Sequence, residues 1–250
     1  MKRYIVILGT RPEAIKLAPI ILGAKNHQGV TVELCSTGQH KEMLDQTLLA
    51  FELTPDYDLS LMTSNQALSE FHAIAVSGIH RVLSNSDFDG VIVQGDTATA
   101  VAGAIAGFHA NLPVIHVEAG LRTWDLSNPF PEEGNRTIID SLATVNAAPT
   151  AQAAENLKKM GIPESNIFVT GNTAIDALLY MKSKIDSSAQ ESSASTDVME
   201  FGSVNFKSGS RIIAVTGHRR ESFGRELEQI CRAIGAIAAS HPDVQIVYPV

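Results

Sequence analysis

The stretch of sequence that decides the fold, residues 91–136, reads VIVQGDTATAVAGAIAGFHANLPVIHVEAGLRTWDLSNPFPEEGNR. Two short apolar runs, at 91–93 and 113–117, flank a segment rich in glycine and alanine at 98–109. The apolar runs are typical of buried strands, and the segment between them is typical of a tightly packed helix. The stretch therefore predicts a βαβ unit.

Acidic residues follow each predicted strand of this unit. Asp96 comes directly after Gly95 at the end of the first strand, and Glu118 ends the second. Glu132 lies in the loop that follows, next to a further acid at 133. Because ligands bind at the carboxyl ends of the strands in open parallel sheets, we expect Asp96, Glu118 and Glu132 to converge on one edge. Each acid taken alone could instead cap a helix, which is a common use of an acid after a strand.

The composition favours a globular protein and excludes several classes of partner. The chain has 250 residues, of which 44% are hydrophobic and 18% charged, which is enough apolar material for a packed core. A formal net charge of −8 argues against a broad surface for nucleic acid or anionic membranes. Cys35 and Cys231 lack the spacing of a metal site or a disulfide, so we expect no metal and a reduced, cytoplasmic setting. No apolar stretch is long enough to span a membrane.

A strand followed by a helix also opens the chain. Residues 4–8 predict a buried strand, and Thr10 and Glu13 have the spacing of a capping box for the helix that follows. Arg11 and Lys16 lie near the start of that helix, where free N–H groups favour phosphate. The alternative is that both are ordinary surface charges. Neither the glycine fingerprint of dinucleotide-binding proteins nor a P-loop is present.

The remaining pattern continues as alternating strands and helices. Strands are predicted at 30–36, 145–148, 167–170, 211–215 and 244–250, with residues 55–61 either irregular or a short edge strand. Helices are predicted at 41–51, 67–83, 135–142, 150–160, 174–185 and 225–239. Residues 187–210, rich in serine and glycine, are interpreted as a mobile connection or insertion.

This order predicts an α/β protein built from doubly wound, Rossmann-like domains. We expect an N-terminal domain at 1–170 and the start of a second domain at 171–250. The second domain ends on a predicted strand without a covering helix, and is therefore expected to be truncated. A cleft between the domains would bring the carboxylates to the basic turn that contains His218, Arg219 and Arg220. Carboxylates that face a basic cluster suit proton transfer on a substrate that carries phosphate, although His218 could simply stabilise its own turn.

Seven motifs closely resemble the bacterial non-hydrolysing UDP-N-acetylglucosamine 2-epimerases. They are GTRPEAIKLAP (9–19), GQHKEMLDQ (38–46), GDT (95–97), HVEAGLRTWD (116–125), PFPEEGNR (129–136), GNTAIDAL (171–178) and TGHRRESFG (216–224). The resemblance implies a GT-B-like fold, with the nucleotide-sugar between two domains. It also implies interconversion of UDP-N-acetylglucosamine and UDP-N-acetylmannosamine. In that reaction, loss of the C2 proton accompanies departure of UDP from C1, and UDP adds back to the resulting 2-acetamidoglucal.

The resemblance further implies roles for individual residues. Asp96, Glu118 and Glu132 would form the acid/base set, and His218 would assist elimination or bind phosphate. Residues implied in substrate binding are Arg11, Lys16, Arg136, Asn172, Arg219 and Arg220. UDP-N-acetylglucosamine would also activate the enzyme at an adjoining allosteric site, which would include Gln39, His40, Gln66, Glu132 and Arg219. A homodimer is implied, and no NAD or metal.

The sequence departs from the family pattern in three respects. Gln94 stands where relatives usually have histidine, and Asn128 stands where serine is common. We interpret both as residues that adjust the site indirectly, without touching the substrate. The end at Val250 would remove most of the domain that holds UDP, so the chain alone is expected to be weak or inactive. A hydrolysing 2-epimerase, a GT-B glycosyltransferase and a non-catalytic nucleotide-sugar binding remnant stay open as alternatives.

Overall fold

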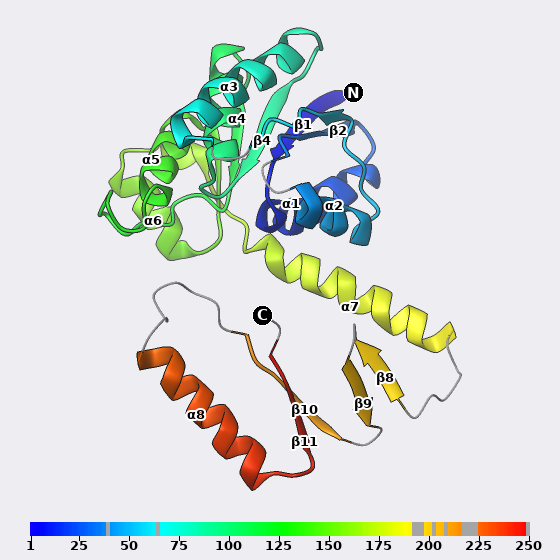
Figure 1. Ribbon diagram of the computed structural model, residues 1–250. Coiled ribbons are helices and arrows are strands. Elements are labelled where there is room, and N and C mark those ends of the chain that lie inside the picture. The colour runs from blue at the N-terminus through cyan, green and yellow to red at the C-terminus, as the bar shows by residue number, and fades with distance from the viewer. Residues whose placement is uncertain are drawn as a thin grey trace. The chain divides into compact units, whose positions relative to one another are not determined.

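A computed structural model describes residues 1–38, 41–63, 66–191, 198–201, 204–207, 210–216 and 225–248 (Figure 1). The chain falls into two compact units, a first unit at Met1–Ser187 and a second unit at Ser188–Val250. The first unit extends past residue 170 because helix α7 (Thr173–Glu191) packs Ala177, Tyr180 and Met181 against its core. The domain division expected after residue 170 stays a prediction.

The first unit is built on a parallel sheet with the strand order β3-β2-β1-β4-β5-β6-β7. Its strands are β1 (Lys2–Leu8), β2 (Val30–Ser36), β3 (Tyr57–Asp58), β4 (Gly90–Gln94), β5 (Val114–Val117), β6 (Val145–Ala148) and β7 (Ile167–Val169). The chain runs outward from β1 to β3 and then returns to β4, beside β1. This reversal is the point at which doubly wound sheets bind ligands.

Helices cover both faces of this sheet (Figure 1). They are α1 (Arg11–Lys25), α2 (Lys41–Ala50), α3 (Leu68–Ser84), α4 (Ala98–His109), α5 (Glu132–Leu142), α6 (Ala151–Lys159), the short η1 (Glu164–Asn166) and α7 (Thr173–Glu191). On β1, Ile5 and Ile7 join a core with α3 and α4, whereas Val6 and Leu8 join a core with α1 and α2. Successive side chains of a strand point to opposite faces, so β1 is buried on both.

Helix α4 lies close to the sheet because its residues are small. A Cβ atom on Gly103 would lie 2.8 Å from Cγ1 of Val93, and one on Gly107 would lie 3.0 Å from Cγ2 of Val91. Larger side chains at either position would push the helix away from β4. The βαβ unit and the tight packing expected for residues 91–117 are therefore confirmed.

The second unit contains a smaller α/β element. Strands β10 (Arg211–Ala214) and β11 (Val244–Val247) pair in parallel, and α8 (Arg225–Ser240) connects them. Strands β8 (Val198–Phe201) and β9 (Val204–Lys207) form an antiparallel pair. The segment 187–210, expected to be a mobile connection or insertion, has regular structure at 187–191, 198–201 and 204–207. It includes the end of α7, which continues to Glu191 rather than ending at 185.

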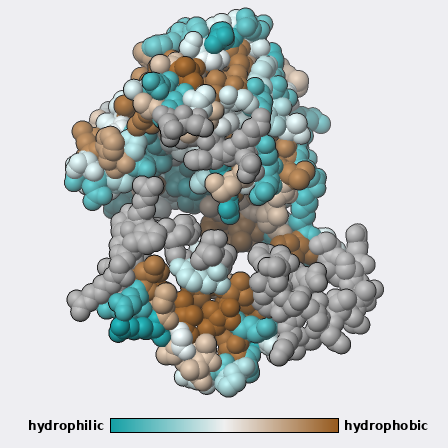
Figure 2. Space-filling model, in the orientation of Figure 1, coloured by the Kyte–Doolittle hydropathy of each residue, from teal (hydrophilic) through white to brown (hydrophobic). Residues whose placement is uncertain are grey.

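The surface of the first unit is mixed in character. In the view of Figure 2, separate apolar areas lie among hydrophilic residues. Exposed apolar side chains on this unit include Phe108, Trp124 and Phe130, with exposed fractions of 58%, 56% and 74%. Among the described residues, none of the helices combines the length and apolarity that crossing a bilayer requires.

Candidate active site

Loops from the carboxyl ends of β1 and β4 are joined by one buried acid. Oε2 of Glu13 accepts hydrogen bonds from the backbone N–H groups of Gly9 (3.0 Å) and Thr10 (2.8 Å), which completes the expected capping role at α1. The hydroxyl of Thr10 also donates to Oε2 (2.8 Å), and Oε1 accepts a hydrogen bond from the hydroxyl of Thr97 (2.6 Å), the residue that caps α4. Burial raises the pKa of Glu13, and these hydrogen bonds oppose that rise. Glu13 therefore ties the start of α1 to the start of α4.

Glu118 directly follows β5 and has a left-handed backbone, at a φ of 67°. Its Oε2 accepts hydrogen bonds from Nζ of Lys16, in the second turn of α1, and from Nε2 of Gln94 (2.6 Å), the last residue of β4. Gln94 pairs with Val117 across β4 and β5, so the neighbouring strand ends bring these groups together. The side chain of Glu118 is 13% exposed and that of Lys16 is 26% exposed. The pair therefore lies at the surface of the sheet edge and within reach of a ligand.

Asp96 follows β4 and is held by residues of α5. Its Oδ2 forms an ion pair with Arg136 (2.6 Å), and the amide Nδ2 of Asn135 donates a hydrogen bond to the backbone carbonyl of Asp96 (2.6 Å). Arg136 also contacts the buried carboxylate of Glu133 at 3.4 Å. Because Asn135 fixes the backbone and Arg136 the side chain, the position of Asp96 depends on where α5 begins.

Glu132 is the first residue of α5, three residues earlier than the helix start expected at 135. Its Oε2 is buried and has no hydrogen-bond partner among the described residues. Leaving such an oxygen unpaired costs roughly 1–3 kcal/mol. A hydrogen-bond donor on a bound molecule would recover that energy. Glu132 therefore has a carboxylate oxygen suited to a ligand, and it lies four residues before Arg136 on the same helix.

The described part of the chain holds no group of three His, Cys, Asp or Glu side chains arranged as metal ligands. The strand ends instead bring carboxylates together with cationic side chains. Such an arrangement can remove or deliver a proton and can stabilise a leaving anion.

Comparison with known proteins identifies the family. The sequence model described as UDP-N-acetylglucosamine 2-epimerase matches residues 23–250. The chain belongs to the UDP-N-acetylglucosamine 2-epimerase family. The expected family and the GT-B-like α/β fold class are thereby confirmed.

Three relatives show how far this epimerase-family chain extends. It is 44% identical over 248 residues to the UDP-N-acetylglucosamine 2-epimerase of Salmonella typhimurium, covering 99% of this chain and 65% of the relative. The Campylobacter jejuni enzyme of the same name is 45% identical over 252 residues, again with 65% of the relative covered. The crystal structure of UDP-GlcNAc 2-epimerase from Neisseria meningitidis bound to UDP-GlcNAc matches with a TM-score of 0.84 and 40% identity, over 100% of this chain and 66% of that one. The chain thus spans about 65% of the length of the curated relatives it matches.

The alternative that the acids cap helices is wrong for Asp96 and Glu118. Thr97, and not Asp96, caps α4 by accepting a hydrogen bond from the N–H of Ala100 (3.0 Å). No helix begins between Glu118 and Glu132, a stretch that is fully described. Glu133, in contrast, does serve structure, because its carboxylate accepts hydrogen bonds from two backbone N–H groups of the loop before α5, each at 3.1 Å.

Other expected site residues of this epimerase-family chain lie on separate segments. Asn172 accepts a hydrogen bond from the N–H of Ala174 (2.9 Å) just before α7, and Gln66 accepts one from the N–H of Thr63 (3.3 Å) before α3. Arg11 is exposed at the first position of α1. The expected residues that lie outside the described part of the chain are Gln39, His40, His218, Arg219 and Arg220.

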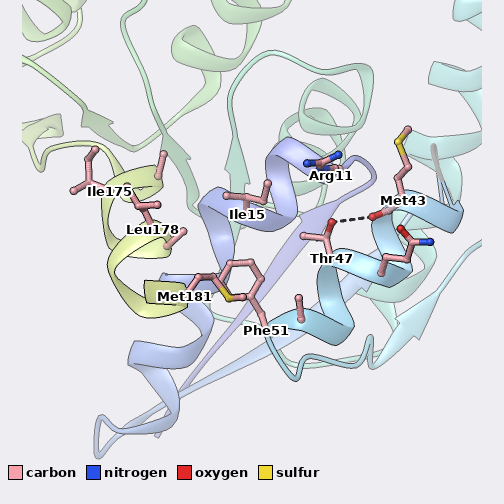
Figure 3. Close-up of a pocket in the computed structure, with 12 residues that line it drawn as sticks. Arg11, Ile15, Met43, Thr47, Phe51, Ile175, Leu178 and Met181 are labelled. Atoms are coloured by element: carbon pink, nitrogen blue, oxygen red, sulfur yellow. Dashed lines mark hydrogen bonds between the residues drawn. The ribbon is translucent and has the colours of Figure 1, made fainter. Parts of the chain in front are cut away.

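A separate pocket of about 730 Å³ lies between α1, α2 and α7 (Figure 3). Arg11 stands at its edge, and most of its lining is apolar, from Ile15, Phe51, Leu178 and Met181 among others. None of the carboxylates described above is among its lining residues. The pocket is therefore separate from Asp96, Glu118 and Glu132.

Sequence reasoning missed two contacts of the site. It did not assign Asn135 any role, although this side chain holds the backbone of Asp96. It also did not anticipate the ion pair of Arg136 with Asp96; the expected role of Arg136 in substrate binding stays a prediction. Both contacts join residues about forty positions apart, so local spacing carried no signal for them.

Proposed function

We propose that this chain carries the acid/base groups of a non-hydrolysing UDP-N-acetylglucosamine 2-epimerase, an isomerase that interconverts UDP-N-acetylglucosamine and UDP-N-acetylmannosamine. The observation that carries the proposal is the placement of Asp96 after β4 and Glu118 after β5, paired with Arg136 and Lys16, together with Glu132 at the start of α5. The Neisseria meningitidis relative, bound to UDP-GlcNAc in its crystal structure, supports the choice of substrate.

The reaction requires a proton to leave C2 on one face of the sugar and another to arrive on the opposite face. A single carboxylate cannot serve both faces, so at least two acid/base groups are needed. The donors to Glu118 share its Oε2, and Oε1 receives no hydrogen bond from the described residues. Glu118 is therefore oriented to accept or deliver a proton through Oε1. Asp96 and Glu132 are the candidates for the second group.

The C2 proton is not adjacent to a carbonyl, so its removal without other bond changes would be very unfavourable. Departure of UDP from C1 in the same step avoids a free carbanion, and the electrons of the C–H bond form the C1–C2 double bond of 2-acetamidoglucal. Stabilising the leaving diphosphate is then as important as the base. Arg11 and the N-terminal ends of α1 and α4 supply positive charge on this edge. We propose that Asn172, His218, Arg219 and Arg220 complete the binding of UDP.

Regulation and assembly are further parts of the proposal. UDP-N-acetylglucosamine is proposed to activate the enzyme at an adjoining site that includes Gln39, His40, Gln66, Glu132 and Arg219. The enzyme is proposed to act as a homodimer in the cytoplasm. Equilibrium sedimentation and substrate-saturation curves would test the dimer and the activation separately.

The test is incubation with UDP-N-acetylglucosamine in D₂O, followed by NMR at the sugar C2. Since the chain spans about 65% of its relatives, it is measured alone and fused to the remaining part of the Salmonella typhimurium enzyme. We expect deuterium at C2 together with UDP-N-acetylmannosamine in the fusion, and little or none in the chain alone. Asp96→Asn and Glu118→Gln should each lower the exchange rate by about 10²–10⁴-fold.

A matched control is Glu164→Gln, which neutralises a carboxylate that is 78% exposed on η1 and should leave the rate unchanged. A fusion that folds but exchanges no deuterium would refute the proposal. Product analysis decides between the alternatives. A hydrolysing enzyme releases free N-acetylmannosamine, a glycosyltransferase requires an acceptor sugar, and a binding remnant shows saturable binding without turnover.

A further inference from the structure

A fully buried ionic network lies directly behind the candidate active site. It consists of His116 on β5, Asp140 on α5 and Arg122 in the loop after β5. The exposed fractions of these side chains are 0%, 0% and 1%. Buried charges of this kind are costly to desolvate and add little to stability. We therefore explain this network by its ability to hold the surrounding groups in one arrangement.

The partners of His116 determine where its hydrogens lie. Nε2 is 2.8 Å from the backbone carbonyl oxygen of Gly95, and Nδ1 contacts Oδ1 of Asp140. A carbonyl oxygen and an ionised carboxylate can only accept hydrogen bonds, so both ring nitrogens must donate. The other oxygen of Asp140 accepts hydrogen bonds from the guanidinium of Arg122 at 2.5 Å and from the N–H of Gly120 at 3.3 Å. The geometry is thus that of an imidazolium between a carboxylate and a carbonyl.

The same network holds the two turns that carry the catalytic acids. The carbonyl bound by His116 belongs to Gly95, the residue before Asp96, and the N–H of Gly95 donates to the carbonyl of Val117 (3.0 Å). The amide bound by Asp140 belongs to Gly120, two residues after Glu118. One set of buried charges therefore fixes the ends of both β4 and β5.

We propose that His116 is a positioning residue: a doubly protonated imidazolium that, with Asp140 and Arg122, sets the relative positions of Asp96 and Glu118. This inference rests on the proposed function, in which protons leave and arrive on opposite faces of C2. The two carboxylates must then keep a fixed separation across the sugar. Displacement of a reacting group by about 1 Å is enough to cost on the order of 100-fold in rate.

The first arm of the test needs no substrate. In the 250-residue chain labelled with ¹⁵N-histidine, NMR at about pH 7 should show hydrogens on both ring nitrogens of His116. Asp140→Asn should change this, because an amide N–H₂ facing Nδ1 makes that nitrogen an acceptor and leaves a hydrogen on Nε2 alone. A wild-type His116 with one unprotonated ring nitrogen would overturn the proposal.

The second arm measures turnover in whichever protein shows C2 exchange. Asp140→Asn and His116→Gln should lower kcat by about 100-fold with little change in KM, because Lys16 and Arg136 are untouched. Ser141→Ala, which alters an exposed hydroxyl on the same helix, is the matched control and should retain wild-type kinetics. If His116→Gln fails to fold, the near-isosteric Asp140→Asn carries this arm.

The outcomes separate the two proposals. A folded Asp140→Asn variant with wild-type kcat would overturn the positioning role while leaving the epimerase proposal intact. Absence of C2 exchange in the wild-type fusion would instead refute the epimerase. In that case the positioning role falls with it, and the NMR arm decides only the protonation of His116. A kcat that falls in Asp140→Asn and is partly recovered in Asp140→Glu, which keeps a carboxylate, would support the positioning role.

Discussion

Gly120→Ala should destabilise the first unit much more than Gly161→Ala, although the two glycines have nearly the same backbone. Their φ values are +82° and +83°. A Cβ atom on Gly120 would lie 2.3 Å from the carbonyl oxygen of Ala153 and 2.9 Å from Cγ of Leu157, both on α6, whereas one on Gly161 would meet nothing within 4 Å. The pair therefore separates the cost of a steric clash from the cost of a left-handed backbone.

The magnitudes follow from these contacts. A left-handed backbone costs a residue with a Cβ about 1–2 kcal/mol, and this cost is common to both variants. Forcing α6 away from β5 adds about 1–3 kcal/mol of overpacking at Gly120 alone. We expect the free energy of unfolding to fall by about 2–5 kcal/mol for Gly120→Ala and by about 1–2 kcal/mol for Gly161→Ala.

Urea unfolding monitored by tryptophan fluorescence measures this difference. The chain has one tryptophan, Trp124, and it lies in the first unit, so its signal reports that unit without interference from the second. The slope of the free energy against urea concentration should be the same for both variants and the wild type. Equal free energies for the two variants, within about 0.5 kcal/mol, would refute the reasoning, because α6 would then have moved aside without cost.

Three further predictions concern single side chains. Lys16→Met should slow the exchange of the C2 proton. Because Lys16 and Glu118 act as a pair, adding Glu118→Gln to this variant should slow the exchange little further. Additive losses of exchange rate in the double variant would contradict this. Burial raises the pKa of Cys35 to about 12, so a thiol reagent at about pH 8 should modify the exposed Cys231 and reach Cys35 only after unfolding. Two fast thiols in the native chain would disprove it. Glu13→Gln should reduce the pH dependence of the free energy of unfolding. The pKa of Glu13 is raised in the folded chain, so its contribution to stability is complete below about pH 4.5 and is lost as the pH rises through the pKa of the folded state. Unfolding in urea at about pH 5 and about pH 8 measures it, and an unchanged pH dependence in the variant would count against this role of Glu13.

Much of the first unit could be predicted because both faces of its sheet are buried. Strands such as β4 then consist of continuous apolar residues, bounded by glycine, and are easily recognised. The small residues of α4 likewise signal close packing. The convergence of Asp96 and Glu118 followed from strand order alone, since parallel strands end at the same edge.

The contacts within the site could not be predicted in the same way. The ion pair of Lys16 with Glu118 joins residues 102 positions apart, and the hydrogen bond of Asn135 to Asp96 joins residues 39 apart. Sequence spacing describes neighbours on one helix or strand and carries no information at such separations. His116 illustrates the limit. It stands inside an apolar run and gave no functional signal, yet it contacts both α5 and the β4 turn.

Under the proposed function, the left-handed backbone at Glu118 opposes the demands of stability and of activity at one position. A φ of 67° costs glutamate about 1–2 kcal/mol relative to glycine, so the backbone alone would favour glycine there. Strain of this kind persists at a functional site only while selection maintains turnover. A library screened for resistance to heat, without a test of catalysis, should therefore tend to replace Glu118 with glycine. A glycine found at this position in a related chain would indicate a protein kept for its fold after its chemistry had been lost.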